Sequence, residues 1–575
     1  MYNGNNIFGY SNQKSEVKRR IWIIMGASIL LFVFLVWRIA SYMYFKASPL
    51  KTMFNAQYTI DEKYGLQYKL TDSNGVDLLN YVTNYYAIID PIDYIRFNEY
   101  TSKYDMQSLI ITLRNYNKSY DLEKIKTSGT GEKIRYKIDK ITFDKLKDIK
   151  QVKGFYTFES KDVVNKKNQN IINVLINTKY DKMDASDGLW KSISKGANSL
   201  EMQIYNKTKN NQYETIRFAK GVNGEIDNGS IIQPKNNINV KLTLDNKIQN
   251  KVKDILQEQK YADYGQIGVV LMESNNGKIR AMSLKDDSYY NINLGMPGTG
   301  GDFPGSIFKV IVEQAGLDTN SITKDEITTV NHNLFDKDAH DYKGKTQFTV
   351  GEALRDSLNN IFGQLGYKIG FQNMYDYASN QGMFSKVLNL QQEEIGKFDK
   401  DVNLLSVDNI IHQAAIGQKM RITPLEALSI PNTIINDGLY VQPSIIDAYV
   451  NDNNQIVEKF IPKTLRVLKT GTSQEVKADM IDVVNEGTGT QAYIEGMNIG
   501  GKTGTTEYFE NKVEFSDGWF VGFFTINDIN YSMVVLVKHI DINKVEGQGS
   551  QGGGDTAAPI FKKIVSALKT IEASN

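Results

Sequence analysis

The sequence predicts an α+β protein with a single N-terminal transmembrane helix, an α+β domain after it, and a C-terminal domain whose antiparallel sheet is flanked by helices. Three observations lead to this prediction. Residues 21–37 form an uncharged apolar run. Residues 46–235 alternate lysine-rich polar stretches with short apolar runs, a pattern typical of many short elements. The sequence from residue 237 onward has strand-like runs at both ends and helical runs between them, which favours one sheet assembled from both ends.

The composition limits the chemistry that the chain can perform. A length of 575 residues exceeds what one hydrophobic core organises, so two or more domains are expected. Lys and Arg number 67 against 66 Asp and Glu, so no global field attracts nucleic acid. Cysteine is absent, which excludes disulfides and thiol catalysis. The four histidines show no metal-ligand spacing, and the G-x-S-x-G elbow of many serine hydrolases does not occur.

The apolar run predicts a transmembrane anchor over residues 21–45. Its uncharged core has 17 residues, at the short end of the roughly 17–25 that span a bilayer, and Trp22 and Trp37 lie where interfacial aromatic residues are expected. Four basic residues and one acidic residue precede it within residues 14–20. The positive-inside rule therefore predicts a cytoplasmic tail over residues 1–20 and an extracellular remainder. The alternative, a cleaved signal peptide, is disfavoured because the run is long and lacks an A-x-A site.

The elements of the C-terminal half follow in a definite order. A polar, turn-rich stretch at 224–237 predicts a boundary between a pedestal domain at 46–236 and a second domain at 237–575. The second domain begins with the strand KLTLD and an amphipathic helix, followed by a hairpin that turns around residues 275–277. It ends with the strands DGWFVGFFTI and YSMVVLVKHI, which the turn NDIN separates, and with a last helix that begins near APIFKK.

Three short motifs carry the chemistry: Ser306-Ile-Phe-Lys309, Ser357-Leu-Asn359 and Lys502-Thr-Gly-Thr505. None is specific alone, because S-x-N also occurs at Ser274 and K-T-G-T also at Lys469. The S-x-x-K pattern begins at seven serines: Ser11, Ser15, Ser48, Ser192, Ser306, Ser321 and Ser566. The surrounding sequence must choose among them.

The context favours Ser306 as a nucleophile. Pro304 and Gly305 precede it and a helical run follows, so Ser306 would begin a helix, where backbone N–H groups stabilise developing negative charge. Lys309 would lie one turn later on the same face and could take the serine proton if its pKa is depressed. The other six serines lie in the tail, beside the membrane, in the N-terminal domain, in a polar loop or on the last helix. A simple helix cap remains the alternative for Ser306.

The other two motifs are placed in the same way. Residues 349–352 read as a capping box that opens a helix ending near Ser357, so Ser357 and Asn359 would lie on a bend between two helices. A polar helix junction without function is the alternative. Lys502 follows two glycines and continues into strand-like sequence, which suits an edge strand that approaches a substrate closely. Lys469 precedes an amphipathic helix and is predicted to cap it instead.

With these motifs the sequence resembles the class B penicillin-binding proteins, the monofunctional D,D-transpeptidases. The resemblance covers roughly residues 237–575 and includes KLTLD, PGSIFK, VGEALRDSLNN, GQKMRITPLEAL, NDG, GGKTGT, WFVGF and AAPIFK in order. It implies the fold of the penicillin-binding and serine β-lactamase-like proteins. It also implies peptidoglycan synthesis on stem peptides ending in D-Ala-D-Ala, inhibition by β-lactams, no metal or organic cofactor, and partners that include a glycosyltransferase.

The resemblance also implies a role for each residue. Ser306 would attack the carbonyl between the two terminal D-alanines, with Lys309 as the base, and form a peptidyl ester as D-alanine leaves. Ser357 would relay a proton to the leaving amine, and Asn359 would hold the substrate amide. Lys502 would supply positive potential. Thr503 and Thr505 would bind the terminal carboxylate beside Gly504, and the N–H groups of Ser306 and Thr505 would form the oxyanion hole.

The N-terminal half matches this family weakly. Only Asp72, Asn74 and Gly75 of the stretch 66–79 agree with the family's R-G-x-I-x-D-R-x-G-like motif. The resemblance implies that the domain at 46–236 is a pedestal that holds the active site away from the membrane and contacts cell-wall assembly proteins.

Four other functions compete with this one. A bifunctional class A protein is rejected because residues 46–235 lack both histidine and a Glu-Asp pair. A β-lactamase with Glu393 or Glu394 as a deacylating base is disfavoured by the longer spacing to Lys502 and by the extra domain. A D,D-carboxypeptidase, which uses water as the acceptor, and a non-catalytic scaffold for wall synthesis both stay open.

Overall fold

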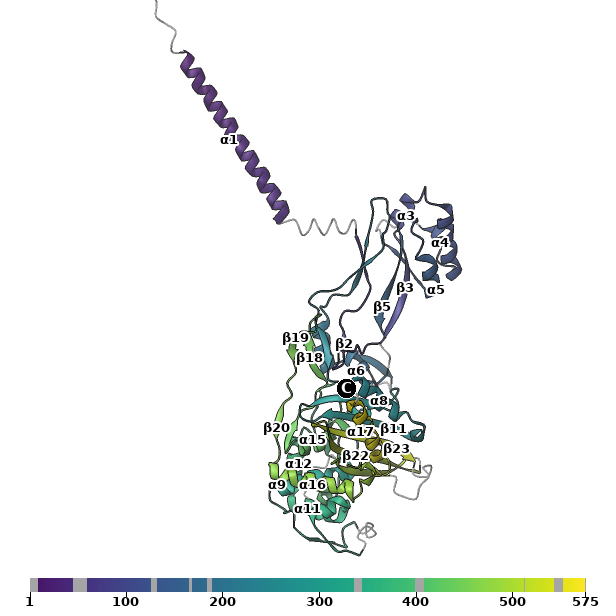
Figure 1. The fold of residues 1–575 in the computed structure, drawn as a ribbon, viewed down its shortest axis with the longest axis vertical. Coiled ribbons are helices and arrows are strands. Elements are labelled where there is room, and N and C mark those ends of the chain that lie inside the picture. Colours follow the sequence, from purple (N-terminus) through teal and green to yellow (C-terminus); the bar gives the residue numbers. More distant parts are fainter. Residues whose placement is uncertain are drawn as a thin grey trace, which may run out of the picture. The chain divides into compact units, whose positions relative to one another are not determined.

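The structure of the chain is a computed structural model (Figure 1). It describes residues 9–573 with gaps at 45–58, 126–131, 165–167, 184–188, 336–343, 399–407, 511 and 542–551. Contacts between residues divide the chain into two compact units. The first unit contains residues 1–65, 83–162 and 213–233, and the second contains residues 66–82, 163–212 and 234–575. The domain boundaries given above, which follow the sequence linearly, remain predictions.

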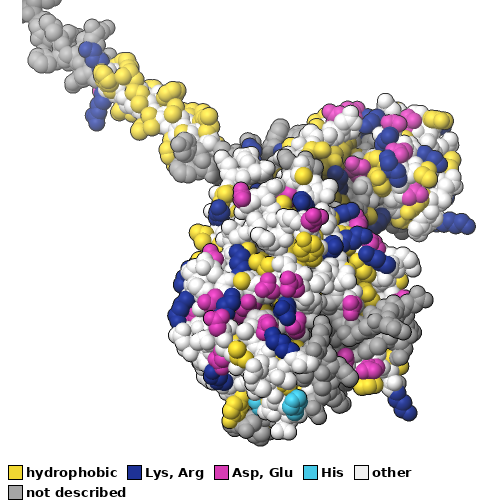
Figure 2. Space-filling view, turned by 60° about the horizontal axis from the view of Figure 1, so that its bottom comes forward, with side chains coloured by type: hydrophobic (Ala, Val, Ile, Leu, Met, Phe, Trp, Pro, Cys, Tyr) yellow, Lys and Arg dark blue, Asp and Glu magenta, His cyan; other side chains and the backbone are white. Residues whose placement is uncertain are grey.

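The N-terminal helix α1 (Gly9–Tyr44) contains the predicted anchor. Within the described residues it is the one helix that is long and apolar enough to cross a membrane, over Glu16–Met43. Its large apolar side chains are exposed along this length, and Figure 2 shows them as a hydrophobic surface with basic side chains at one end. A helix pairs its backbone polar groups internally, as a lipid environment requires. A surface that is apolar on all sides is typical of a helix that faces lipid.

The remainder of the first unit is α+β. One sheet has the strand order β4-β3-β5, and a second has the order β1-β8-β9. The helices α4 and α5 pack on the first sheet through Leu109, Leu113 and Leu146, all fully buried. The elements are β1 (Thr59–Lys63), β3 (Tyr81–Ile89), α3 (Pro91–Phe97), α4 (Lys103–Tyr116), β4 (Ile134–Ile138), α5 (Lys140–Leu146), β5 (Phe155–Val163), β8 (Thr215–Ala219) and β9 (Ser230–Ile232).

A five-stranded antiparallel sheet organises the second unit, with the order β12-β11-β23-β22-β21. The strands come from both ends of the C-terminal half, as predicted. They are β11 (Tyr264–Glu273), β12 (Lys278–Leu284), β21 (Gly500–Glu510), β22 (Val513–Ile526) and β23 (Ile529–Asp541). The turn at 274–277 joins β11 to β12, and Asn527 and Asp528 join β22 to β23, so both predicted turns are confirmed.

Both faces of this sheet are buried, and its side chains alternate between two cores. On β23, Val535 and Val537 belong to one core and Val534 and Leu536 to the other. The helices α8 (Asn246–Leu256) and α17 (Ala557–Ala573) pack on the first face. Helices from the middle of the chain cover the second face: α14 (Pro424–Ala427), α15 (Ser429–Ile435) and α16 (Thr470–Asn485). The helix α9 (Lys309–Asp318) packs against α16. Because both faces are covered, these strands read as continuous apolar runs in the sequence.

Further elements of the second unit complete the frame around this sheet. The helices are α6 (Ile171–Ile176), α7 (Leu200–Thr208), α10 (Val350–Arg355), α11 (Asn359–Ile369), α12 (Phe371–Asn380) and α13 (Asp408–Ala415). A four-stranded sheet has the order β19-β18-β10-β2, with β2 (Leu70–Thr71), β10 (Asn239–Leu242), β18 (Ile446–Val450) and β19 (Ile456–Lys459). Two-stranded pairs are β6 (Lys179–Met183) with β7 (Trp190–Ser194), β13 (Thr328–Thr329) with β14 (Gln347–Phe348), β15 (Lys397–Phe398) with β16 (Met420–Arg421), and β17 (Leu439–Val441) with β20 (Thr464–Arg466).

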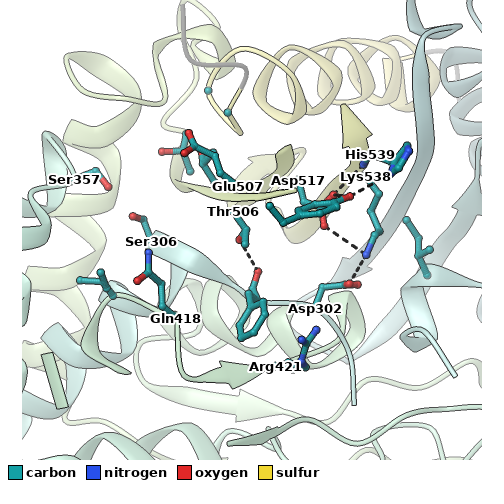
Figure 3. Close-up of a pocket in the computed structure, with 18 of the residues that line it drawn as sticks. Asp302, Ser306, Ser357, Gln418, Arg421, Thr506, Glu507, Asp517, Lys538 and His539 are labelled. Atoms are coloured by element: carbon teal, nitrogen blue, oxygen red, sulfur yellow. Dashed lines mark hydrogen bonds and ion pairs between the residues drawn. The ribbon is translucent and has the colours of Figure 1, made fainter. Parts of the chain in front are cut away.

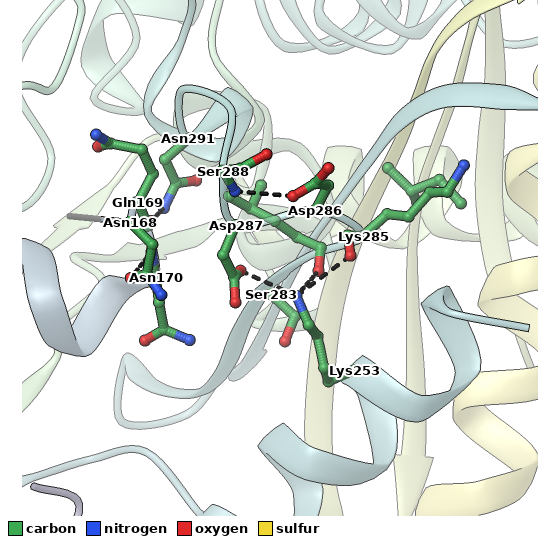
Figure 4. A network of polar contacts seen from close by, with 12 residues as sticks. Asn168, Gln169, Asn170, Lys253, Ser283, Lys285, Asp286, Asp287, Ser288 and Asn291 are labelled. Carbon is green, nitrogen blue, oxygen red and sulfur yellow. Dashed lines mark hydrogen bonds and ion pairs between the residues drawn. The ribbon is translucent and has the colours of Figure 1, made fainter. Parts of the chain in front are cut away.

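Polar contacts fix residues 163–212 to this unit (Figure 4). The Gln169 N–H donates to the carbonyl of Asp287 at 2.7 Å, and Asn291 Nδ2 donates to the carbonyl of Gln169 at 3.1 Å. Lys253 forms an ion pair with Asp287 at 3.0 Å. Asn170 caps α6 beside these contacts. The loop after β12 therefore holds the beginning of α6 against the sheet that carries the candidate site.

Candidate active site

Ser306 lies in a short 3-10 turn, η4 (Gly305–Phe308), that leads directly into α9. In a 3-10 turn, side chains three residues apart lie one above the other, so Ser306 and Lys309 project to the same side. Lys309 is fully buried, whereas Ser306 lines a cleft of about 1730 Å³ (Figure 3). The predicted helix start is therefore present at Ser306, with a 3-10 first turn.

Ser357 lies on the bend between α10 and α11, with a left-handed backbone conformation at φ 58°. The predicted capping box begins α10: Thr349 Oγ1 accepts from the Glu352 N–H at 3.3 Å, and Glu352 accepts from the Thr349 N–H at 3.0 Å. A left-handed conformation costs a residue with a Cβ about 1–2 kcal/mol. Such strain persists where the surrounding structure fixes it, which is common at functional sites.

Two buried lysines converge on Ser357. Lys309 Nζ lies 3.2 Å from Ser357 Oγ and donates to the Ser357 carbonyl at 2.6 Å and to Asn359 Oδ1 at 2.7 Å. Lys502 Nζ lies 2.9 Å from the same Ser357 Oγ. A hydroxyl has two lone pairs and one hydrogen. When Ser357 Oγ accepts from both lysine amino groups, its own hydrogen can be donated to a third group in the cleft.

Lys502 lies on β21, the edge strand of the five-stranded sheet, as predicted. Its side chain is fully buried, and this burial lowers the pKa of Lys502 to about 7. Thr503 and Thr505 line the cleft on the same strand. The Gly553 N–H donates to Thr505 Oγ1 at 3.2 Å. This edge therefore presents two hydroxyls beside a lysine that changes charge near neutral pH.

The turn that carries Ser306 touches β21 through backbone atoms. Gly305 has φ 55°, and a Cβ there would lie 2.6 Å from the carbonyl oxygen of Thr505. A Cβ on Gly504 would lie 2.5 Å from the carbonyl oxygen of Pro304. Both glycines are thus required by this close approach, which brings the Ser306 turn against the strand that carries Lys502.

We expect Gly305→Ala to lower the stability of the protein by roughly 3 kcal/mol or more, because backbone strain and a backbone clash add. Gly298 provides the matched control. It has φ 81°, but a Cβ there would meet open space, with no atom within 4 Å. Gly298→Ala should therefore cost only about 1–2 kcal/mol of strain. Thermal unfolding of both variants tests this, and equal losses would show that the approach to Thr505 is not tight.

The competing motifs lie elsewhere. Lys469 is the N-cap residue of α16, as predicted, and its Nζ donates to the carbonyl of Asp318 at 2.6 Å. Ser274 lies in the hairpin turn and shares a 2.7 Å hydrogen bond with Ser532. Glu393 is buried and accepts hydrogen bonds from backbone N–H groups of residues 387, 388 and 390. These three residues do not line the cleft among the residues described.

Several residues of the cleft were missed by the sequence analysis. They are Asp302, Gln418, Arg421, Thr506, Asp517 and Lys538. Asp517 and Lys538 carried a usable signal, because each is a charge within or next to an otherwise apolar strand sequence. Gln418 and Arg421 lie in the GQKMRITPLEAL stretch that carries the family resemblance, but only the folded chain brings this segment beside Ser306.

Comparison with known proteins gives the family. Residues 267–566 match the family described as the penicillin binding protein transpeptidase domain. Stage V sporulation protein D of Bacillus subtilis is 29% identical over 383 residues, which cover 60% of this chain and 56% of that protein. Penicillin-binding protein PbpB of Mycolicibacterium smegmatis is 24% identical over 387 residues, which cover 62% of this chain and 58% of that protein. The matches thus span little more than half the length of these curated relatives.

Solved structures agree on the fold. Penicillin-binding protein 2X from Streptococcus thermophilus has a TM-score of 0.63 at 16% identity, covering 90% of this chain and 81% of that one. Penicillin-binding protein 3 from Mycobacterium tuberculosis, complexed with aztreonam, has a TM-score of 0.54 at 17% identity, covering 89% and 97%. Because the family match covers just over half of the sequence, the chain belongs to the penicillin-binding protein transpeptidases, and relatives such as stage V sporulation protein D and PbpB support class B among them.

Proposed function

We propose that this protein is a serine-type peptidoglycan D,D-transpeptidase with Ser306 as its nucleophile. Ser306 Oγ attacks the carbonyl between the two terminal D-alanines of a stem peptide, D-alanine leaves, and a peptidyl ester remains. An amine from a neighbouring stem then takes the peptidyl group. The observation that carries the proposal is the convergence of Lys309 and Lys502 on Ser357 Oγ, at 3.2 and 2.9 Å, in the cleft that Ser306 lines.

Each proton transfer has a group of suitable chemistry. Lys309, one 3-10 turn after Ser306, takes the Ser306 proton as a neutral amine. Ser357 donates its proton to the leaving nitrogen and is replenished by the lysines that contact its oxygen. Asn359 Oδ1 accepts from Lys309 at 2.7 Å, which orients the amide so that it can hold the substrate backbone.

The charge that develops in the reaction is stabilised from β21. The ammonium of Lys502 and the hydroxyls of Thr503 and Thr505 bind the terminal carboxylate of the substrate beside Gly504. The backbone N–H groups of Ser306 and Thr505 form the oxyanion hole, because the close approach at Gly305 brings these two segments together. A β-lactam, which carries a carboxylate and a strained amide, acylates Ser306 through the same groups.

Turnover of a synthetic stem peptide ending in D-Ala-D-Ala tests the proposal. We expect release of D-alanine together with a cross-linked product when an amine acceptor is supplied. Release of D-alanine with hydrolysed peptide alone, at every acceptor concentration, would instead assign a D,D-carboxypeptidase. No release by the folded protein would assign a non-catalytic scaffold.

The lowered pKa of Lys502 gives a pH dependence. Below about pH 7 the side chain is the cation that binds a carboxylate, and above it the side chain is neutral. The second-order rate constant for acylation by a carboxylate-bearing β-lactam should therefore fall as the pH rises through about 7. Lys469→Met, in the second K-T-G-T sequence, should keep this profile, and Lys502→Met should lose the alkaline fall. A flat wild-type profile from about pH 6 to about pH 9 would contradict the role of Lys502.

The anchor and the pedestal complete the proposal. Helix α1 crosses the cell membrane with residues 1–20 in the cytoplasm and the catalytic domain outside. Because the chain has no cysteine, a single cysteine at the exposed position Tyr100 would report its side of the membrane to an impermeant maleimide. Labelling in intact cells supports this orientation, and labelling only after lysis opposes it.

The domain at 46–236 holds the site away from the membrane and contacts a glycosyltransferase, which cross-linking from the same cysteine would capture.

A further inference from the structure

A buried group of three charges lies at the end of the cleft away from Ser357 (Figure 3). The Lys538 ammonium forms an ion pair with Asp302 and lies 3.4 Å from Asp517 Oδ2. None of the three side chains is more than 12% exposed. Burial alone would lower the pKa of Lys538, but the two carboxylates outweigh it and hold the pKa above its usual value. Lys538 is therefore a fixed cation between two carboxylates.

A β-bulge aims Lys538 at this position. The register between β22 and β23 shifts between Ser516 and Gly518, and β23 carries one residue more than β22 there. His539 lies at this irregularity and has a left-handed backbone conformation, with φ 58°. Its N–H donates to Asp517 Oδ1 at 2.9 Å. Bulges commonly redirect a side chain next to an active site. Asp517 thus contacts both the bulge and the lysine that the bulge redirects.

The other end of this group is the segment that leads to the nucleophile. Asp302 precedes Ser306 by four residues, and Pro304 stiffens the connection. The backbone of Asp302 exchanges two 2.9 Å hydrogen bonds with Ile422. The carbonyl of Phe303 accepts from Thr506 Oγ1 at 3.1 Å and from Trp519 Nε1 at 3.0 Å.

We infer that Lys538 is a positioning residue for the nucleophile. Lys538 lies at the bulge of β23, where Asp517 of β22 contacts it, and it binds Asp302 and thereby sets the position of the turn that carries Ser306. The backbone hydrogen bonds of residues 302 and 303 hold this segment to Ile422, Thr506 and Trp519. The ion pair between Lys538 and Asp302 fixes the position of the segment along β23, a central strand with neighbours on both sides. This inference rests on the proposed function.

The same unit contains a comparable pair that does not touch the cleft. Lys195 and Glu201 are both fully buried and form a 2.8 Å ion pair, and Glu201 also accepts from the Gln391 N–H at 3.1 Å. Neutralising Glu201 or Asp302 leaves the buried lysine that it contacts with a weaker partner, which destabilises the fold. Only Asp302 lies next to the nucleophile turn, so only its neutralisation should alter the reaction.

The test compares Asp302→Asn with Glu201→Gln in the full chain held in detergent micelles. Stopped-flow kinetics with a fluorescent penicillin separate the binding constant Ks from the acylation rate constant k2. We expect Asp302→Asn to lower k2 by roughly 10- to 100-fold, with Ks nearly unchanged, since small displacements of a reacting group cost about this much. Glu201→Gln should lower the melting temperature without changing k2.

Each other outcome has one meaning. An unchanged k2 in Asp302→Asn, or an equal loss in Glu201→Gln, overturns the positioning role while the proposed function stands. A wild-type protein that penicillin and stem peptide both fail to acylate overturns the proposed function and this inference with it. If Asp302→Asn does not fold, Lys538→Arg gives the same readout, because it keeps the charge but moves it. A lower k2 at an unchanged melting temperature supports the inference, and an unchanged k2 overturns it.

Discussion

Ser306→Ala should reduce stem-peptide turnover by roughly 10⁴-fold or more, because it removes the oxygen on which the peptidyl ester forms. The change removes one oxygen atom from a half-buried position, so the melting temperature should stay close to that of the wild type. Release of D-alanine, followed over time in both proteins, provides the measurement.

Ser566→Ala is the matched control for this loss. Ser566 begins another S-x-x-K sequence, but it is exposed on α17, where its Oγ donates to the carbonyl of Lys562 at 2.9 Å. Turnover by Ser566→Ala should equal that of the wild type. Substantial turnover by Ser306→Ala would mean that another residue carries the acyl group.

Lys309→Met has the second largest expected effect, a loss of roughly 10²- to 10⁴-fold in the acylation rate constant, the range for removal of a general base. Methionine nearly matches the length of lysine, so packing in the core is largely kept. The change removes the amine that contacts Ser357 and Asn359. Stopped-flow acylation by a fluorescent penicillin measures the loss, and thermal unfolding of the same sample reports the cost of removing those hydrogen bonds.

Lys324 supplies the comparison, since it ends the S-x-x-K sequence that begins at Ser321. Its Nζ lies 3.7 Å from Asp479, and its side chain is 41% exposed. Lys324→Met should keep the wild-type acylation rate. If Lys309→Met is acylated as fast as Lys324→Met, another group must take the proton of Ser306.

The sequence was sufficient for the parts of the site that local patterns encode. The capping box at Thr349, the hairpin turn after β11 and the apolar strands β22 and β23 each carry a signal within a few residues, and each is present in the structure. The choice of Lys502 over Lys469 also followed from local sequence, since one continues into a strand and the other into a helix. Local interactions decide such features, so a single sequence reveals them.

Other features depend on contacts between distant residues and were not predicted. The bulge at Lys538 and His539 contains no glycine or asparagine that would predict it, and the His539 N–H that it leaves donates to Asp517 on the neighbouring strand. Likewise, Asp72 accepts from the Asn246 N–H at 3.0 Å, and β2 pairs with β10 in parallel. A segment read as part of the pedestal thus packs with the catalytic unit. Only the folded chain brings such partners together.

In the proposed reaction Ser306 carries the acyl group, and mass spectrometry of the protein after reaction with a penicillin detects that adduct. We expect one penicillin mass per chain, stable for the duration of the experiment and mapped to the peptide that contains Ser306. The adduct should be absent from Ser306→Ala and present in Ser566→Ala. A stable adduct on any other residue, or rapid release of hydrolysed penicillin from Ser306 as in a β-lactamase, would contradict this expectation.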